Sequence, residues 1–213
     1  MVETFHSLQG EGVHVGRSAF FIRLAGCSVG CSWCDTKHSW PTEPHRRLRV
    51  EALAEQARAA AAAFVVITGG EPLQHPLDDL CAVLRQGTAA DTVHQAVPDA
   101  EGFPLHLETS GVHPLSGRFD WITLSPKPHR PPTEELLGRC DELKVVVHHQ
   151  DDLTFAVAMA AAAARLRRDR PGLHLLLQPG WESHLGQQLA MAFVQRHPQW
   201  RLSLHSHKWL GVR

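Results

Sequence analysis

The sequence predicts an α/β protein, folded as a partial, open (β/α) barrel of mainly parallel strands. Short β-branched or apolar runs alternate with longer amphipathic runs rich in Ala and Leu. Strands separated by helices form parallel β-α units with right-handed crossovers. The units fall short of the eight that close a barrel, and polar motifs follow nearly every predicted strand.

The short apolar runs predict strands at Ala19–Leu24, Phe64–Thr68, Leu105–Glu108, Trp121–Leu124, Leu143–Val147, Leu173–Leu177 and Arg201–Leu204. The amphipathic runs predict helices at Val50–Ala63, Leu77–Arg85, Asp152–Arg168 and His184–Arg196. The connections Thr109–Phe119 and Pro126–Cys140 are too short for a full helix. No repeat or low-complexity linker interrupts the pattern, so residues 1–213 are expected to form one domain.

Composition is that of an ordinary globular protein, with 43% hydrophobic and 20% charged residues. A net charge of −1 gives no electrostatic footprint for nucleic acid or an anionic membrane. No apolar run is long enough for a membrane span, and the N-terminus lacks the features of a signal peptide. A cytoplasmic location is therefore expected. The sixteen His residues are scattered along the chain.

Polar motifs stand where the predicted strands end. Because the carboxyl ends of parallel strands in a barrel share one face, where active sites are built, this arrangement indicates an enzyme. The motifs are Cys27–Cys34, Thr68–Pro72, Glu108–Gly111, Ser125–Lys127, Gln178–Pro179 and His205–Lys208.

Three of the five Cys residues form a C-x3-C-x2-C motif at Cys27, Cys31 and Cys34. In a reducing compartment, such clustering indicates metal binding rather than disulfides. Soft thiolates suit a 4Fe–4S cluster with one open iron, but they also suit zinc, and His38 would complete a Cys3His site. The predicted fold is large enough to be stable without a structural zinc ion, which favours the iron–sulfur cluster. Cys81 and Cys140 are expected to be small buried hydrophobes.

The C-x3-C-x2-C motif followed by Gly69-Gly70-Glu71-Pro72 resembles the radical S-adenosylmethionine superfamily. Within it, the chain is similar to the 7-carboxy-7-deazaguanine synthase family, on motifs that span essentially its whole length. The diagnostic ones are Leu8–Gly12 (LQGEG), Cys34–Thr36 (CDT) and His207–Gly211 (HKWLG).

The resemblance implies a shortened radical-SAM core and a ring contraction of 6-carboxy-5,6,7,8-tetrahydropterin to 7-carboxy-7-deazaguanine, with loss of ammonia, for queuosine or another deazapurine. It also implies a 4Fe–4S cluster, S-adenosyl-L-methionine, Mg2+, an electron donor such as flavodoxin or ferredoxin, and a homodimer. Two alternatives stay open: another radical enzyme, such as a glycyl-radical activase, and a non-enzymatic zinc scaffold. LQGEG and Thr36 count against the activase.

The resemblance also assigns roles by motif. Cys27, Cys31 and Cys34 would hold the cluster and Thr36 the Mg2+. The residues expected at the cofactor are Trp33, Asp35, Gly70, Glu71, Thr109, Ser110, Ser125, Pro126, Lys127, Gln178 and Pro179. Those expected at the pterin are Leu8, Gln9, Gly10, Glu11, Arg23, Thr68, His207 and Arg213.

Elementary chemistry supports several of these roles and leaves alternatives. Gly70 lets the backbone approach a ligand closely, although glycine also suits any turn. Arg23, in an apolar strand, suits a substrate carboxylate or a structural ion pair. Thr36 is either an Mg2+ ligand, since Mg2+ keeps most of its waters, or an ordinary loop Thr. Lys144 either faces the barrel interior or extends to the surface.

Overall fold

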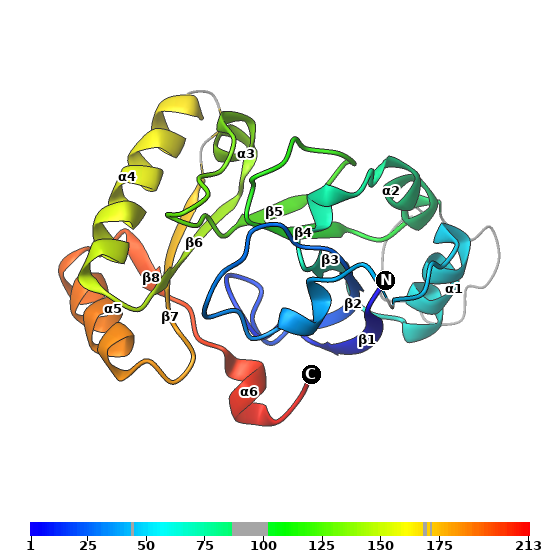
Figure 1. The fold of residues 1–213 in the computed structure, drawn as a ribbon, viewed down its shortest axis with the longest axis horizontal. Coiled ribbons are helices and arrows are strands. Elements are labelled where there is room, and N and C mark those ends of the chain that lie inside the picture. Colours follow the sequence, from blue (N-terminus) through cyan, green and yellow to red (C-terminus); the bar gives the residue numbers. More distant parts are fainter. Residues whose placement is uncertain (44, 87–101, 168–169, 171) are drawn as a thin grey trace.

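The structure, a computed structural model, describes residues 1–43, 45–86, 102–167, 170 and 172–213. One eight-stranded sheet runs in sequence order from β1 to β8 (Figure 1). β1 is antiparallel to β2, and each later neighbouring pair is parallel. The strands are β1 (Glu3–Leu8), β2 (Ser18–Leu24), β3 (Val65–Gly69), β4 (Leu105–Thr109), β5 (Trp121–Leu124), β6 (Glu142–Val147), β7 (His174–Pro179) and β8 (Trp200–Leu202).

The helices lie along the sheet in two groups. Figure 1 shows α1 and α2 beside the half of the sheet that begins at β2, and α3, α4 and α5 beside the half that ends at β8. The helices are α1 (Val50–Ala60), α2 (Asp78–Arg85), α3 (Glu134–Arg139), α4 (Gln150–Leu166), α5 (His184–Arg196) and α6 (Ser206–Leu210), with 3-10 turns at Lys37–Ser39 and Pro72–Gln74.

The core is a set of aliphatic side chains aligned across the parallel strands. Ile22, Ile67, Leu107 and Ile122 stand in register on four successive strands, and all four are buried. Strands covered on both faces read as continuous apolar runs, which is why they could be located from the sequence. Cys81 and Cys140 are buried as expected, and burial raises their pKa values to about 11 and about 12.

The predicted fold class is confirmed. All seven predicted strands and all four predicted helices are present, and the strand ends differ from prediction by at most two residues. The first helix stops before Ala63 because Ala61 takes a left-handed conformation with φ 49° and caps it. The predicted end of the third helix, Arg168, lies outside the described residues.

Three elements have no counterpart in the prediction. The edge strand β1 mixes polar and apolar residues and is only half-buried, so it carries no apolar run. The six residues of α3 fit into the connection considered too short for a full helix, and the Thr133 side chain caps them by accepting from Leu136 N. The third is α6, a single turn near the C-terminus.

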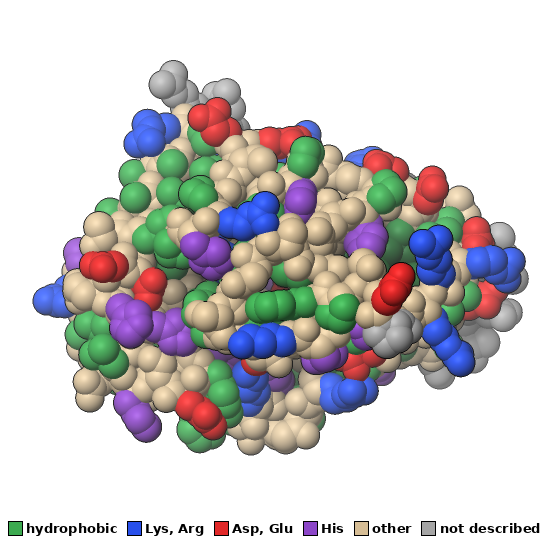
Figure 2. All heavy atoms as spheres, in the orientation of Figure 1, with side chains coloured by type: hydrophobic (Ala, Val, Ile, Leu, Met, Phe, Trp, Pro, Cys, Tyr) green, Lys and Arg blue, Asp and Glu red, His purple; other side chains and the backbone are tan. Residues whose placement is uncertain are grey.

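The surface carries mixed charges. Figure 2 shows acidic and basic side chains interspersed on one face and His side chains spread over it. Among the described residues, no helix combines the length and apolarity that a bilayer crossing requires.

Leu107→Ala should destabilise the fold strongly. Leu107 is fully buried on a central strand, and truncation there removes apolar burial and leaves a cavity. We expect a loss of about 3 kcal/mol in the free energy of unfolding, measured by urea denaturation. Leu185→Ala, at a side chain that is 53% exposed, is the matched control and should change it by less than about 0.5 kcal/mol. Equal effects of the two changes would contradict this placement of the core.

Candidate active site

One cavity of about 290 Å³ opens at the carboxyl ends of the strands. Nearly all residues singled out in the sequence line it: Leu8, Gln9, Gly10, Glu11, Arg23, Cys27, Cys31, Trp33, Cys34, Asp35, Thr36, Thr68, Gly70, Glu71, Thr109, Ser110, Ser125, Lys127, Gln178, His207 and Arg213. Pro126 and Pro179, which the motifs also place at the cofactor, do not line it. Each is buried and directly follows a lining residue, Ser125 or Gln178.

The cysteine loop follows β2 and is pinned by backbone hydrogen bonds. Gly26 N donates to Ser39 O at 2.8 Å, and Cys27 N donates to Trp40 O at 3.1 Å. Cys31 is buried, while Cys27 and Cys34 are partly exposed. His38, the potential fourth zinc ligand, is an exposed residue of the 3-10 turn Lys37–Ser39.

The donor set fits a thiolate-bound iron–sulfur cluster. In the described part of the chain, Cys, His, Asp and Glu side chains are not gathered in threes around a common point, so the fit rests on chemistry. Burial raises the pKa of Cys31, the positive charge of Lys127 opposes this, and the two neighbouring thiols raise it further. Bound iron would offset the repulsion between the three neighbouring thiolates, because coordination to a metal favours the thiolate form.

The turn after β3 is fastened directly to the cysteine loop. Gly70 N donates to Leu24 O at 3.0 Å, and Glu71 N donates to Gly26 O at 2.8 Å. A Cβ at Gly70 would lie 2.3 Å from Gly26 O and 2.9 Å from Cys27 Cβ. Gly70 is therefore required by the close approach of two protein backbones, in addition to any approach of a ligand.

Glu71 links the end of β3, which it follows, to the end of β4. Its carboxylate is 1% exposed and accepts from Thr109 Oγ1 at 2.5 Å, from Ser110 N at 2.8 Å and from the Ser110 hydroxyl. It also accepts from Leu73 N at 3.1 Å. The hydroxyls of Thr109 and Ser110, expected at the cofactor, thus position Glu71 while their residues line the cavity.

A buried cation stands beside the cysteines. Lys127 Nζ donates to Ser125 O at 2.7 Å and Ser125 Oγ at 2.6 Å, and lies 5.1 Å from the centre of the Trp33 ring. Burial lowers its pKa to about 8, while the nearby Cys31 opposes that shift. The amine is thus placed to attract an anionic ligand at this end of the cavity.

Arg23 forms the structural ion pair considered for it and is also exposed to the cavity. It lines the cavity, and its Nε pairs with Glu3 Oε1 at 3.1 Å. Glu3 Oε2 in turn lies 2.7 Å from Arg213 Nη2, and Ser7 Oγ donates to Arg213 O at 2.6 Å. The C-terminal segment is thereby held along β1 at the cavity mouth.

The loop after β1 reaches into the cavity. Gln9 Nε2 donates to Glu108 Oε1 at 2.9 Å, and Thr68 Oγ1 lies 3.5 Å from Glu108 Oε2. At the other end of the C-terminal segment, Lys208 Nζ pairs with Asp35 Oδ2 at 2.6 Å. The cysteine loop, the N-terminal loop and the C-terminal segment therefore enclose one space.

Several lining residues received no firm role from the sequence. Glu108 belongs to the ETSG motif but carried no assignment, and Lys144 proves to face the interior rather than the surface. Strand alternation is the signal that distinguishes inward from outward positions, but it cannot say which inward side chain reaches a ligand. The other lining residues without an assignment are Phe5, Phe21, Val29, Trp40, Gly69, Thr123, Val146 and His205.

Comparisons with known proteins identify the family of the chain. The family model "Radical SAM superfamily" matches residues 21–147. A 7-carboxy-7-deazaguanine synthase from Prochlorococcus marinus is 50% identical, covering 100% of this chain and 97% of the relative. Another from Synechocystis is 47% identical, with 100% and 93% covered.

The fold is matched as well. The crystal structure of QueE from Escherichia coli superposes with a TM-score of 0.75 at 30% identity, covering 96% of this chain and 92% of that one. Similarity over the full length, together with cysteines, turn and cavity in one place, decides between the readings that the motif left open, because a zinc scaffold would not need them all. The chain belongs to the 7-carboxy-7-deazaguanine synthase family of the radical S-adenosylmethionine superfamily.

Proposed function

We propose that this protein converts 6-carboxy-5,6,7,8-tetrahydropterin to 7-carboxy-7-deazaguanine with release of ammonia. The observation that carries the proposal is one cavity lined by both sets of residues. The three cysteines line it, and so do Arg23 and Leu8, Gln9, Gly10 and Glu11 of the LQGEG loop. A radical must be generated next to the atom that it attacks, so the two sets of residues need to share one enclosed space.

The cofactor side is built from Cys27, Cys31 and Cys34, which would hold the 4Fe–4S cluster, and from Gly70 and Glu71 on the neighbouring turn. When bound, the cluster and S-adenosyl-L-methionine supply a 5′-deoxyadenosyl radical. Glu71, fixed by its donors, offers a rigid wall beside the cysteine loop. Ser125 and Lys127 also line the cavity, with Lys127 beside the cysteine loop, where a cation and a hydroxyl suit the polar groups of the cofactor.

The substrate side places polar groups of complementary kinds around the remaining space. The planar guanidinium of Arg23 suits the carboxylate of the pterin. The Gln9 amide both donates and accepts, as the edge of a pterin ring requires, and Thr68 adds a hydroxyl on β3. Leu8, Gly10, His207 and Arg213 complete the enclosure from the two chain termini.

Mg2+ would bind at Thr36. Its hydroxyl is half-buried and lies 3.5 Å from Cys34 Sγ at the edge of the cavity. One protein ligand is enough, because Mg2+ keeps several waters and takes other oxygens from its substrate.

The proposal extends to partners and location. A reductant such as flavodoxin or ferredoxin would supply the electron, and the chain would act as a homodimer in the queuosine or another deazapurine pathway. Free thiols at the cluster site suit a cytoplasmic, reducing compartment.

Turnover tests the proposal directly. Anaerobically reconstituted protein with pterin, Mg2+ and dithionite should form 7-carboxy-7-deazaguanine without net consumption of S-adenosyl-L-methionine, as measured by liquid chromatography and mass spectrometry. Cys31→Ala should abolish both the brown colour and the product. Cleavage of the cofactor without this product would refute the substrate while leaving the superfamily intact.

Thr36→Ala should weaken the response to Mg2+. Removal of the only proposed protein ligand should raise the Mg2+ concentration for half-maximal turnover about tenfold, measured by titration of metal-stripped enzyme. Thr36→Ser keeps a hydroxyl and should stay close to the parent. Thr154→Ala, on the exposed face of α4, is the control for a distant Thr. An unchanged titration in Thr36→Ala would mean that Mg2+ binds elsewhere.

A further inference from the structure

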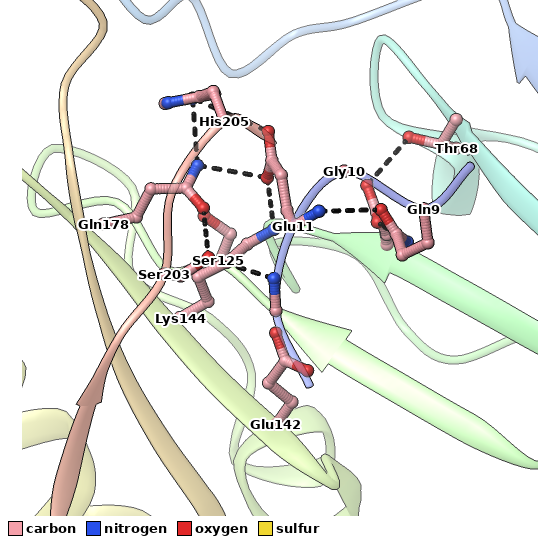
Figure 3. A network of polar contacts seen from close by, with 12 residues as sticks. Gln9, Gly10, Glu11, Thr68, Ser125, Glu142, Lys144, Gln178, Ser203 and His205 are labelled. Carbon is pink, nitrogen blue, oxygen red and sulfur yellow. Dashed lines mark hydrogen bonds and ion pairs between the residues drawn. The ribbon is translucent and has the colours of Figure 1, made fainter. Parts of the chain in front are cut away.

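A part-buried ion pair between two residues that line the cavity, Lys144 and Glu11, lies at the centre of a polar network (Figure 3). Lys144 Nζ, on β6, is 2.5 Å from Glu11 Oε2, on the loop after β1. Gln178 Nε2 donates to the same oxygen at 3.0 Å, and His205 Nε2 lies 3.5 Å from Glu11 Oε1. Figure 3 shows these side chains converging on Glu11 from β6, β7 and the segment after β8. The Glu11 carboxylate is therefore already engaged by the protein.

The ion pair holds the loop that carries Gln9. Glu11 N donates to Gln9 Oε1 at 3.2 Å, which leaves Gln9 Nε2 to donate to Glu108 Oε1 at 2.9 Å. The orientation of the Gln9 amide is thus set by the backbone of Glu11. Any displacement of Glu11 would free the amide to rotate, and the amide is the group proposed to read the pterin edge.

The same loop also seats the C-terminal segment. Gly10 O accepts from Ser206 N at 2.9 Å and from Ser206 Oγ at 2.8 Å. A Cβ at Gly10 would lie 2.2 Å from His207 Nδ1, so the His207 side chain packs directly against the backbone of Gly10. A shift of the loop at Glu11 would therefore be transmitted to His207 as well as to Gln9.

The next two residues of the loop, Gly12 and Val13, donate hydrogen bonds to side chains of the sheet region. Gly12 N donates to Ser203 Oγ at 2.9 Å, and Ser203 Oγ donates to Gln178 Oε1 at 2.7 Å. Val13 N donates to Glu142 Oε2 at 3.0 Å. Hydrogen bonds from backbone N–H groups thus position the residues that follow Glu11. The principal partner of the Glu11 side chain is the Lys144 ammonium.

Charge balance depends on Lys144, which is 4% exposed. Burial disfavours its ammonium, but Glu11, Glu108 and Glu142 together raise its pKa. Burial would likewise raise the pKa of Glu11, but Lys144 and His205 lower it to about 2. One ionised lysine therefore stands among three glutamates, and its removal would leave the part-buried Glu11 carboxylate without its nearest cation.

We propose that Lys144 is a positioning residue for substrate binding, which acts by fixing Glu11 and, through its loop, the Gln9 amide and His207. This inference rests on the proposed function for its kinetic readout. It goes beyond that function because it assigns Glu11 to holding the loop that carries Gln9, and not to direct contact with the pterin. The side chains that meet the pterin are then Gln9 and its neighbours.

The test compares Lys144→Met with the double variant Lys144→Met/Glu11→Gln. The single change removes the cation and leaves a part-buried carboxylate unpaired with Lys144, so we expect the pterin KM to rise at least about tenfold, with the KM for S-adenosyl-L-methionine unchanged. The double variant removes both charges and keeps an oxygen that Gln178 can still reach, so the pterin KM should return to within about threefold of the parent. Arg201→Met, at an exposed strand residue, is the charge-matched control and should behave as the parent.

The pH profile separates this role from simple loss of packing. The charged or titratable groups around the pair are Lys127, His205, Lys208, Asp35, Glu71, Glu108 and Glu142. Without Lys144, burial dominates and the pKa of Glu11 rises, so its carboxyl is neutral at low pH and carries an uncompensated charge at high pH. The kcat/KM of Lys144→Met, relative to the parent, should therefore fall as pH rises from about 6 to about 8. The double variant should show no such trend.

Hydrogen exchange provides a readout that needs no turnover. In the reconstituted holoenzyme, amides of residues 9–17 should exchange faster in Lys144→Met and return toward the parent rate in the double variant. A parent enzyme that forms no product would refute the proposed function but leave this exchange test standing. Unchanged exchange in Lys144→Met, an unchanged pterin KM, or a double variant as impaired as the single one would each overturn the positioning role.

Discussion

The close contact between the end of β3 and the cysteine loop is the constraint on which the site depends. The two backbones meet where no side chain fits at Gly70, and hydrogen bonds from Gly70 N and Glu71 N close the contact. Glu71 then draws in the end of β4 through Thr109 and Ser110. The ends of β2, β3 and β4 are thus joined around the cysteine loop by backbone and buried polar contacts.

The other half of the site is organised by charge instead of backbone contact. Lys144, on β6, faces glutamates on three different elements, and Gln178 and His205 extend the network to the ends of β7 and β8. Buried charges are tolerated only where they are paired, so each member of this network constrains the others. The loop after β1 is the common partner, and it brings the N-terminal and C-terminal segments together over the cavity.

Much of this arrangement follows from the sequence. Buried parallel strands give apolar runs, and their polar ends marked the site, so Cys27, Glu71 and Lys127 could be expected at one face beforehand. The LQGEG loop was added by the resemblance to the family. Strand β1 escaped prediction because an edge strand lacks a continuous apolar run. The partner of each polar group also escaped, since pairings such as Glu11 with Lys144 or Arg23 with Glu3 join residues far apart in the chain. Local patterns contain no information on such pairings.

The two halves of the site are stabilised by separate sets of contacts, and this separation has an evolutionary consequence. On the proposed function, the contacts of Gly70 and Glu71 would support the radical-generating chemistry, and the network around Lys144 would support recognition of the substrate. Substitutions in that network would leave the contacts of Gly70 and Glu71 in place. A scaffold divided in this way can adopt a new substrate while it keeps its radical chemistry intact, which makes the loop after β1 the natural starting point for such a change.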